Sequence, residues 1–283
     1  MDTVGGLVLV ADTGNHCIRA FDYDGYPLRT WYHHVDSARG RVLGEPQSVL
    51  VSRPGLLYVL DAVTDYVDVM DLLGSTIRQI RPADLEGLDA STLEAGPAAD
   101  VSRKPTAFAL DRDERLLIAF GNSPATLVAL DPEDRVVWTL RGDEGGGARF
   151  GAITDVSVGI DGRIYVTDGT AEPAVRVYSH EPRFLFGFGG HDVGDHNFSF
   201  PSAVAATADG RIWVIDSIRQ TIKVFDREGG FLGYFGGAGV ASGDLLYPTS
   251  IDTDGRERLF VVERVGARLT SYRVQEFASA VQP

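Results

Sequence analysis

The histidines are the side chains in this sequence best suited to metal binding or proton transfer. Their positions are His16, His33, His34, His180, His191 and His196. They form one group near the N-terminus and a second group well over a hundred residues later. A zinc site needs its ligands about 2 Å from one ion. The two groups therefore bind a common metal only if the fold brings them together.

A second candidate set is acidic and recurs at one position of a repeated pattern. A β-rich run ends in an acid at Asp12, Asp61, Asp168, Asp216 and Glu263. An acid between a strand and a polar turn accepts hydrogen bonds from the backbone N–H groups of that turn. We therefore expect these carboxylates to cap turns rather than to catalyse a reaction.

Common catalytic and cofactor-binding motifs are absent from the sequence. It contains neither GxSxG nor HExxH, the patterns of serine hydrolases and of many zinc proteases. The glycine-rich stretches, such as Gly145–Gly147, do not match the phosphate-binding pattern GxxxxGK[ST]. The single cysteine, Cys17, excludes an intramolecular disulfide. We expect no cofactor and no bound metal.

The charge of the chain argues against two classes of partner. The net charge is −14, and no three basic residues follow one another. Proteins that bind nucleic acid or anionic membranes need a basic face. We therefore expect no nucleic-acid partner. No apolar run approaches the roughly 18–20 residues of a membrane helix, and the N-terminus lacks the pattern of a signal peptide. We expect a soluble chain, and its compartment stays open.

An internal repeat determines the expected fold. Six copies of one pattern occur, among them LVLVADTGNHCIRAFD, RIYVTDGTAEPAVRVYS and RIWVIDSIRQTIKVFD. They close at Phe21, Met70, Leu130, Tyr178, Phe225 and Tyr272, with intervals of 47 to 49 residues and one of 60. Flanking β-rich runs and turn residues give four strands to a copy. Units of about 40–50 residues with four strands are typical of β-propeller blades.

The sequence therefore predicts an all-β, six-bladed β-propeller of four-stranded antiparallel blades, forming a single domain over residues 1–283. The blades cover approximately residues 1–35, 44–80, 105–140, 150–189, 199–236 and 246–275, with an insertion at 81–104. The first and last blades look incomplete, because the pattern supplies little of the first strand of blade 1 and no fourth strand of blade 6. We expect a further strand to pair beside Leu7–Ala11, supplied by upstream residues, by the tail Val274–Pro283 or by another chain.

Specific motifs resemble those of the NHL-repeat family of six-bladed β-propellers. They are ADTGNHCIRAFDYDGYPLRTW and the linkers FGGHDVGDHNFSFP and FGGAGVASGDLLYP. The resemblance covers nearly the whole chain, is close in blades 1, 4 and 5, and is poor in blade 3. It implies the propeller fold. Because NHL propellers include binding modules, sensor domains and a few lyases, it does not imply one function.

The expected fold places several candidate binding residues on one face. With strands a to d in each blade, the turns between strands b and c share a face with the linkers between blades. This top face would carry His16, His33, His34, Tyr66, Arg219 and Arg264, all of residue types found in protein interfaces. The two histidine groups would lie on opposite rims and would not converge on a metal. The insertion Arg81–Lys104 would lie over the same face, between blades 2 and 3.

Two functions remain open at this point. The first is a non-catalytic interaction or assembly module that binds a protein partner through its top-face loops. The alternative is a propeller enzyme, a lyase or a lactonase-like hydrolase, with its site in the central funnel of that face. A blade of the related lyases resembles residues around Asp155 and Thr170, but Thr170 stands where the lyases have tyrosine. A small-molecule ligand stays unknown.

Overall fold

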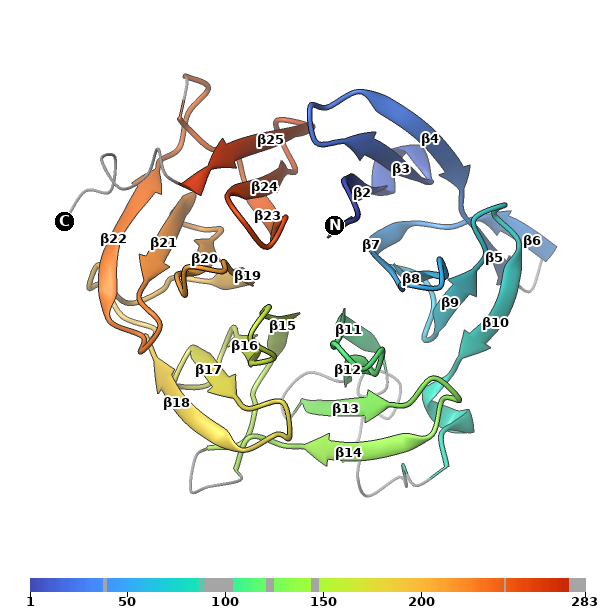
Figure 1. Ribbon diagram of the computed structural model, residues 1–283, viewed down its shortest axis with the longest axis horizontal. Coiled ribbons are helices and arrows are strands. Elements are labelled where there is room, and N and C mark those ends of the chain that lie inside the picture. The colour runs from blue at the N-terminus through green and yellow to red at the C-terminus, as the bar shows by residue number, and fades with distance from the viewer. Residues whose placement is uncertain are drawn as a thin grey trace. The chain divides into compact units, whose positions relative to one another are not determined.

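The computed structural model describes residues 1–37, 40–86, 88, 104–120, 125–143, 148–241 and 243–274. Six antiparallel sheets dominate these residues, and the predicted six-bladed β-propeller is confirmed (Figure 1). Five of the sheets have four strands and the sixth has three. In every sheet the strands are paired in chain order, and we name them a to d in that order. Two compact units divide the chain: Met1–Gly121 with Leu127–Thr139, and Asn122–Thr126 with Leu140–Pro283.

The first unit contains blades 1 to 3. Their strands are β1 (Asp2–Val4), β2 (Leu7–Asp12), β3 (Cys17–Asp22) and β4 (Pro27–Tyr32); β7 (Pro46–Val51), β8 (Leu57–Asp61), β9 (Val67–Met70) and β10 (Thr76–Ile80); and β11 (Pro105–Leu110), β12 (Leu116–Phe120), β13 (Thr126–Leu130) and β14 (Val136–Leu140).

The second unit contains blades 4 to 6. Their strands are β15 (Ile153–Val158), β16 (Ile164–Asp168), β17 (Val175–Tyr178) and β18 (Phe184–Phe188); β19 (Pro201–Ala206), β20 (Ile212–Asp216), β21 (Thr221–Phe225) and β22 (Phe231–Gly236); and β23 (Pro248–Thr253), β24 (Arg258–Glu263) and β25 (Arg268–Arg273).

Strand a of blade 1 is short but present, so the first blade has four strands where the sequence suggested fewer. The three residues of β1 pair with Leu7, Val8 and Leu9 of β2. Part of the strand expected beside Leu7–Ala11 is thus supplied by Asp2–Val4. Among the described residues, blade 6 has strands a to c, as the sequence predicted.

Two segments between blades differ from a plain repeat. The linker between blades 1 and 2 forms a hairpin that the sequence did not predict, from β5 (His34–Ser37) and β6 (Gly40–Leu43). Most of the insertion at 81–104 lies outside the described residues, so its predicted position is not tested. Its beginning forms a 3-10 turn, η2 (Pro82–Asp84), and the following Leu85 and Leu88 are buried in the core between blades 2 and 3.

Strands b and c form the interior of the blades. Every residue of β8, β12, β16 and β20 is buried, and so is every residue of their c-strand partners in those blades. This agrees with the near-continuous apolar runs of the repeat, which are typical of strands covered on both faces. Fully burying one large apolar side chain contributes about 1.5–3 kcal/mol. Burial of these central strands is therefore a main source of stability in each blade.

The linkers between blades are anchored by apolar side chains that reach into the core. Phe150, Phe198 and Leu245 each precede strand a of the next blade by three residues and are almost completely buried. Phe198 packs against Phe225 of β21, with ring centroids 5.8 Å apart. The linkers cross the ends of the blades as loops with one side chain inserted, rather than as free connections.

Glycine is required where two of these linkers leave strand d. Gly189 and Gly236 have φ angles of 70° and 86°, in the left-handed region that favours glycine. A Cβ on Gly189 would lie 2.4 Å from Phe198, and a Cβ on Gly236 would lie 2.6 Å from Leu245. The FGG motif thus turns the chain and leaves room for the anchor residue.

In blades 2, 4 and 5 the acid at the end of strand b binds both the following turn and the preceding linker, whereas Asp12 of blade 1 accepts hydrogen bonds from the Asn15 side chain instead of capping its turn through backbone N–H groups. In blade 4 the carboxylate of Asp168 accepts hydrogen bonds from Thr170 and Ala171 in the turn, which confirms the predicted capping role. It also accepts bonds from the linker residues Gly151 and Ala152, at 2.8 and 3.0 Å. One buried carboxylate therefore satisfies four backbone N–H groups.

The linker contact recurs in three other blades. The linker N–H groups that donate to the strand-b acid belong to Glu45 in blade 2, Ser199 and Phe200 in blade 5, and Leu246 in blade 6. The residue after each acid returns a bond, because its N–H donates to a linker carbonyl. In blade 5, for example, Ser217 donates to Phe200 at 3.1 Å. Turns and linkers therefore form one bonded layer within each unit, which we call the linker end.

Removing this carboxylate should destabilise the protein strongly. We expect Asp168→Asn to lower the free energy of unfolding by about 3–5 kcal/mol, because it leaves buried donors and the nearby Arg176 without their anionic partner. Urea denaturation measures the loss. Glu228→Gln, which changes an exposed acid of the same unit, is the matched control and should stay within about 0.5 kcal/mol of the wild type. Equal stabilities of the two variants would contradict the capping role.

Candidate functional site

The structure places the four predicted residues of the first unit in different environments. His16 is half-buried, and its Nδ1 lies 2.7 Å from the carbonyl oxygen of Gly44. His33 and Tyr66 are buried, and His34 is half-buried. The ring of Tyr66 lies against the Arg81 guanidinium, 4.4 Å from its carbon to the ring centroid. His33 and Tyr66 therefore do not offer their side chains to a docking partner, and the binding roles of His16 and His34 stay predictions.

His33 instead lies between two buried carboxylates. Its Nε2 is 3.3 Å from Oδ2 of Asp61 and 3.5 Å from Oδ2 of Asp68, and its side chain is 0% exposed. Burial acts to raise the pKa of Asp61, but the hydrogen bond from His33 and the N–H groups of Val63 and Glu45 outweigh it, so the pKa lies below its usual value. The imidazole is thus the side chain that separates the two acids.

A comparison of the blades explains why a histidine lies there. At the equivalent position of strand c, blade 4 has Arg176 and blade 5 has Lys223, each within about 4 Å of its strand-b acid. Blade 2 has Asp68 at this position, which places a second acid where blades 4 and 5 have a cation. His33 enters from the linker and takes the place of the missing base.

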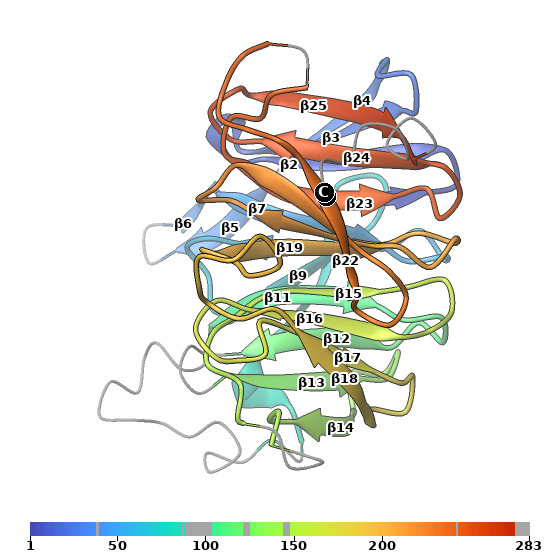
Figure 2. The ribbon, with the colours of Figure 1, turned by 90° about the vertical axis from the view of Figure 1, so that its left-hand side faces the viewer.

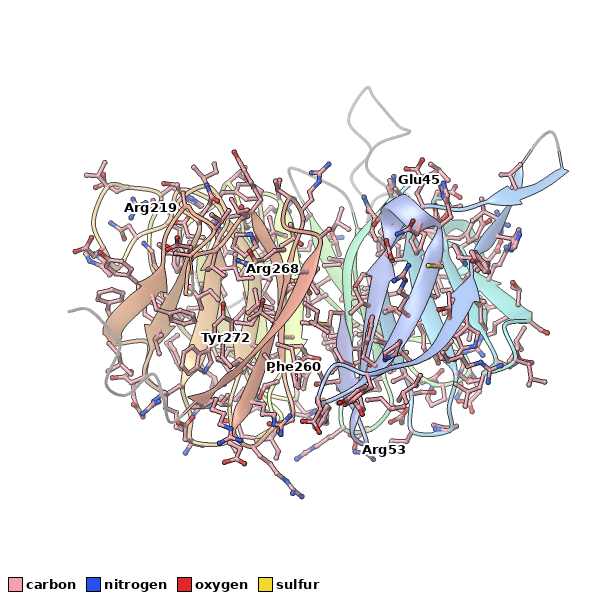
Figure 3. All side chains as sticks on the ribbon, turned by 90° about the horizontal axis from the view of Figure 1, so that it is seen from above. Glu45, Arg53, Arg219, Phe260, Arg268 and Tyr272 are labelled. Carbon is pink, nitrogen blue, oxygen red and sulfur yellow. The ribbon has the colours of Figure 1, made fainter. Side chains whose placement is uncertain are left out.

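The two predicted arginines of the second unit also differ from each other. The guanidinium of Arg219 donates to Ser199 Oγ and to the carbonyl oxygens of Asp192 and Gly194, at 2.8 to 3.0 Å. It therefore holds the linker between blades 4 and 5 in place. Arg264 is exposed in the turn of blade 6. Figure 3 shows Arg219 at the linker end of this unit, whereas Phe260 lies toward the other end.

The most distinctive surface of the second unit is a group of exposed apolar side chains at its linker end. We call them the apolar rim. They are Val193, Ile218, Val240, Tyr247 and Val265, and between 51% and 88% of each residue is exposed. Val193 and Val240 lie on linkers, Tyr247 directly precedes β23, and Ile218 and Val265 lie on turns between strands b and c. Large apolar residues exposed together are typical of interaction sites.

Hydrogen bonds connect the loops that carry the rim. Arg219, next to Ile218, bonds to the carbonyl of Asp192, next to Val193. Gln220 accepts a hydrogen bond from the N–H of Tyr247, and the carbonyl of Tyr247 accepts one from Arg264, next to Val265. The rim therefore continues from blade 4 to blade 6 without a break in the bonded layer.

The backbone of Tyr247 adds to the case for this surface. Its φ angle is 51°, a left-handed conformation that is uncommon for a bulky residue. Strained conformations persist where surrounding structure imposes them, and they are enriched at functional sites. Here the bonds of Tyr247 to Gln220 and Arg264 impose it, and the result is an aromatic ring directed to solvent.

The sequence contained a signal for the rim that we did not use. The turn between Asp216 and Gln220 and the turn after Glu263 each contain one large apolar residue, Ile218 and Val265. An apolar residue in the middle of an otherwise polar turn has no partner in the core. The residue types usual in interface hot spots directed attention to Arg219 and Arg264 instead.

One carboxyl group on a first strand is also unusual. Asp155 of β15 accepts a hydrogen bond from the N–H of Val204 in β19, at 2.9 Å, and so joins the first strands of blades 4 and 5. Burial raises its pKa to about 7, and the hydrogen bonds to Val204 and Val156 offset this only in part. Thr170 does not face this group but donates its N–H to Asp168.

Comparison with known proteins agrees with this architecture. The chain is 29% identical over 176 residues to NHL repeat-containing protein 3 of Mus musculus, which covers 59% of this chain and 47% of that protein. This match and the six-bladed fold together support an NHL-repeat β-propeller. The chain matches about half the length of this mouse relative, and no family model matches it.

Solved structures share the fold of this NHL-repeat propeller at low sequence identity. A protein of unknown function from Bacteroides thetaiotaomicron superposes with a TM-score of 0.65 at 16% identity, covering 95% of this chain and 67% of the other. Virginiamycin B lyase from Staphylococcus aureus gives a TM-score of 0.59 at 10% identity, covering 97% and 83%. At these identities the likeness concerns the fold alone. In the described part of the propeller, no helix is long and apolar enough to span a membrane.

Replacing His33 should destabilise the protein, because it removes the imidazole that lies between two buried carboxylates. We expect His33→Ala to lower the free energy of unfolding by about 3–5 kcal/mol, because it leaves two buried carboxylates without their shared partner. Chemical denaturation at neutral pH measures the effect. The matched control, His34→Ala, alters a half-buried neighbour and should cost less than about 1 kcal/mol. A loss from His33→Ala no larger than that of the control would contradict the bridging role.

Asp155 should make stability depend on pH in a defined direction. With a pKa of about 7, the folded chain keeps a proton that the unfolded chain loses above the ordinary value of 3.8. The stabilisation from this proton is full below that ordinary value and is lost as the pH rises through about 7. The Asp155→Asn variant has no carboxyl group to ionise at this position. Its stability therefore does not fall with the ionisation that destabilises the wild type.

We therefore expect Asp155→Asn to gain free energy of unfolding relative to the wild type between about pH 5 and pH 8. Urea denaturation at both pH values measures the difference, with Glu228→Gln as a control for a surface acid. If the wild type and Asp155→Asn change in parallel over this range, the raised pKa is wrong.

Proposed function

We propose that this NHL-repeat propeller is a non-catalytic interaction module that binds a partner protein through the apolar rim. The observation that carries the proposal is the exposure of Val193, Ile218, Val240, Tyr247 and Val265 on bonded loops of three consecutive blades. On the turns of the hairpin end of the same unit, between strands a and b and between c and d, Ile160 is the one large exposed apolar side chain among the described residues; Phe184, Leu185 and Leu232 at the starts of the d strands are exposed by 36% to 45%. The asymmetry favours the linker end as the docking surface.

The rigidity of the rim loops supports the same function. The linker between blades 4 and 5 is fixed by Asp216, Arg219 and the buried Phe198. Lys223 also donates to the carbonyl of Asn197, and burial, with repulsion from Arg219, lowers its pKa to about 8. A surface that is ordered before binding loses less conformational entropy when the partner docks.

Charge defines the partner further. The chain carries a net charge of −14, and Arg264 is an exposed base beside the rim. We expect the partner to place apolar side chains on the rim, basic residues around them and an acidic residue opposite Arg264. The basic residues would attract the partner to this acidic chain over long range, and the acid facing Arg264 would fix its orientation at short range.

Affinity measurements on surface variants test the proposal. The partner is first captured by cross-linking in an extract of the source organism and then purified. We expect Ile218→Asp and Val265→Asp each to weaken its binding at least about tenfold, because each places a charge in an apolar contact. Isothermal titration calorimetry gives the affinities, and thermal unfolding confirms that the variants fold.

Ile160→Asp is the matched control, since Ile160 is 71% exposed and lies on a turn at the hairpin end. It should bind the partner as the wild type does. The proposal fails if no captured protein loses affinity with the rim variants, or if Ile160→Asp has the same effect as they have.

The alternative, a lyase or a lactonase-like hydrolase, has one observation in its favour. Asp155 has a pKa of about 7, which suits a general acid or base near neutral pH. Turnover of a lactone that is lost in Asp155→Asn and retained in Ile218→Asp would favour the enzyme over the interaction module.

A further inference from the structure

The first unit has a pocket on the outer edge of blade 1, lined in part by His34 of the linker between blades 1 and 2. The pocket has a volume of about 370 Å³ and lies between β4 and the turn that joins β9 to β10. Arg29, Trp31 and Tyr32 of β4 line one side, and Leu73 and Gly74 of the turn line the other, with His34 nearby. This volume is in the lower range of ligand-binding pockets.

The strand beside the pocket has an unpaired edge. β4 is the last strand of its sheet, so among the described residues its outer N–H and C=O groups have no neighbouring strand (Figure 1). Five of its six residues are exposed, whereas the d strands β10 and β14 each have one exposed residue of five. A long and exposed edge of this kind is a template for a further strand.

The residues of β4 alternate between two faces. Trp31 is buried, and its indole Nε1 donates to the carbonyl of Leu72 at 2.9 Å, so the ring forms a fixed wall of the pocket. Arg29, on the same face, lies over this ring, with 5.2 Å between the guanidinium carbon and the ring centroid. Tyr32, on the opposite face, is exposed and also lines the pocket, and Leu28 is exposed at an irregularity in the pairing of β4 with β3. The edge thus offers a charged side and an apolar side.

The charged side is basic. Within the described residues, Arg29 and His34 form no ion pair, and no acidic side chain lines the pocket. This is notable in a chain with a net charge of −14. A guanidinium held over an aromatic ring presents its N–H groups in the fork that matches a carboxylate.

We propose that this pocket binds an extended acidic peptide segment of a partner protein. The segment adds to the free edge of β4 as a fifth strand and places a Glu or Asp side chain against Arg29, with a ring N–H of His34 as a second donor. Alternate side chains of the segment are apolar and cover Leu28 and Tyr32. The site lies in the first unit and is separate in sequence from the apolar rim, so it stands whether or not the rim binds a partner.

Binding of defined peptides tests the proposal. The probes are fluorescein-labelled, C-terminally amidated pentapeptide mixtures whose central residue is Glu, Gln or Lys, with flanking positions drawn from Val, Ile, Thr and Tyr. By fluorescence anisotropy, we expect the Glu mixture to bind the intact protein at least about tenfold more tightly than the Gln mixture. The Lys mixture should not bind.

Two further measurements separate strand addition from simple charge attraction. Arg29→Gln should abolish the preference for Glu over Gln, whereas Arg112→Gln, which changes another exposed arginine of the same unit, should retain it. N-methylation of alternate peptide amides should prevent binding, and bound peptide should slow the hydrogen exchange of β4 amides.

Equal binding of the Glu and Gln mixtures, or no binding at millimolar peptide, would overturn the proposal. So would a preference that survives Arg29→Gln. If N-methylated peptides still bind and the hydrogen exchange of the β4 amides is unchanged, the peptide is held by charge attraction alone. That result would contradict the added strand. The proposal also fails if a second copy of the protein covers the edge of β4. That result would be a dimer in which the β4 amides exchange only after the dimer dissociates.

Discussion

The loops of this propeller depend on one repeated interaction, the binding of linker N–H groups by a carboxylate at the end of strand b. In blade 5, Asp216 accepts bonds from Ser199 and Phe200 in the linker and from Arg219 in the turn. A buried carboxylate is stable only when it is paired and hydrogen-bonded, and these backbone donors satisfy it. The same bonds stop the linker from moving independently of the blade. The acid is therefore structural, yet it determines the shape of the surface that we propose binds a partner.

Blade 2 shows how far this interaction constrains the sequence around it. Strand c there carries Asp68 in place of a base, and the linker supplies His33 to separate it from Asp61. The imidazole leaves no space for a side chain at Gly44, where a Cβ would lie 2.6 Å from the His33 ring. A change at one repeat position is thus accompanied by a histidine and a glycine in a different segment. Residues that look available for binding in the sequence are needed inside the structure.

The fold could be predicted from the sequence because each blade is encoded locally. Apolar strands, polar turns and the acid before each turn repeat at nearly constant intervals, and the same features form the sheets of the structure. The burial of His33 could not be predicted, because it depends on the pairing of a linker with a different strand. The apolar rim was missed for a different reason: Ile218 and Val265 were treated as part of ordinary turns, although a turn gives such side chains nothing to pack against. The groove beside β4 depends on the approach of Leu73 from the next blade, which no local pattern encodes.

Hydrogen exchange at Ser199 and Phe200 tests most directly whether the strand-b carboxylate holds the linker. Both amides donate to Asp216 in the wild type, and Asp216→Asn removes the anionic acceptor. We predict that these two amides exchange at least about a hundredfold faster in the variant under native conditions. Amides in the centres of β16 and β17 should keep their protection. If the two linker amides stay as protected in Asp216→Asn as in the wild type, the strand-b carboxylate does not hold the linker.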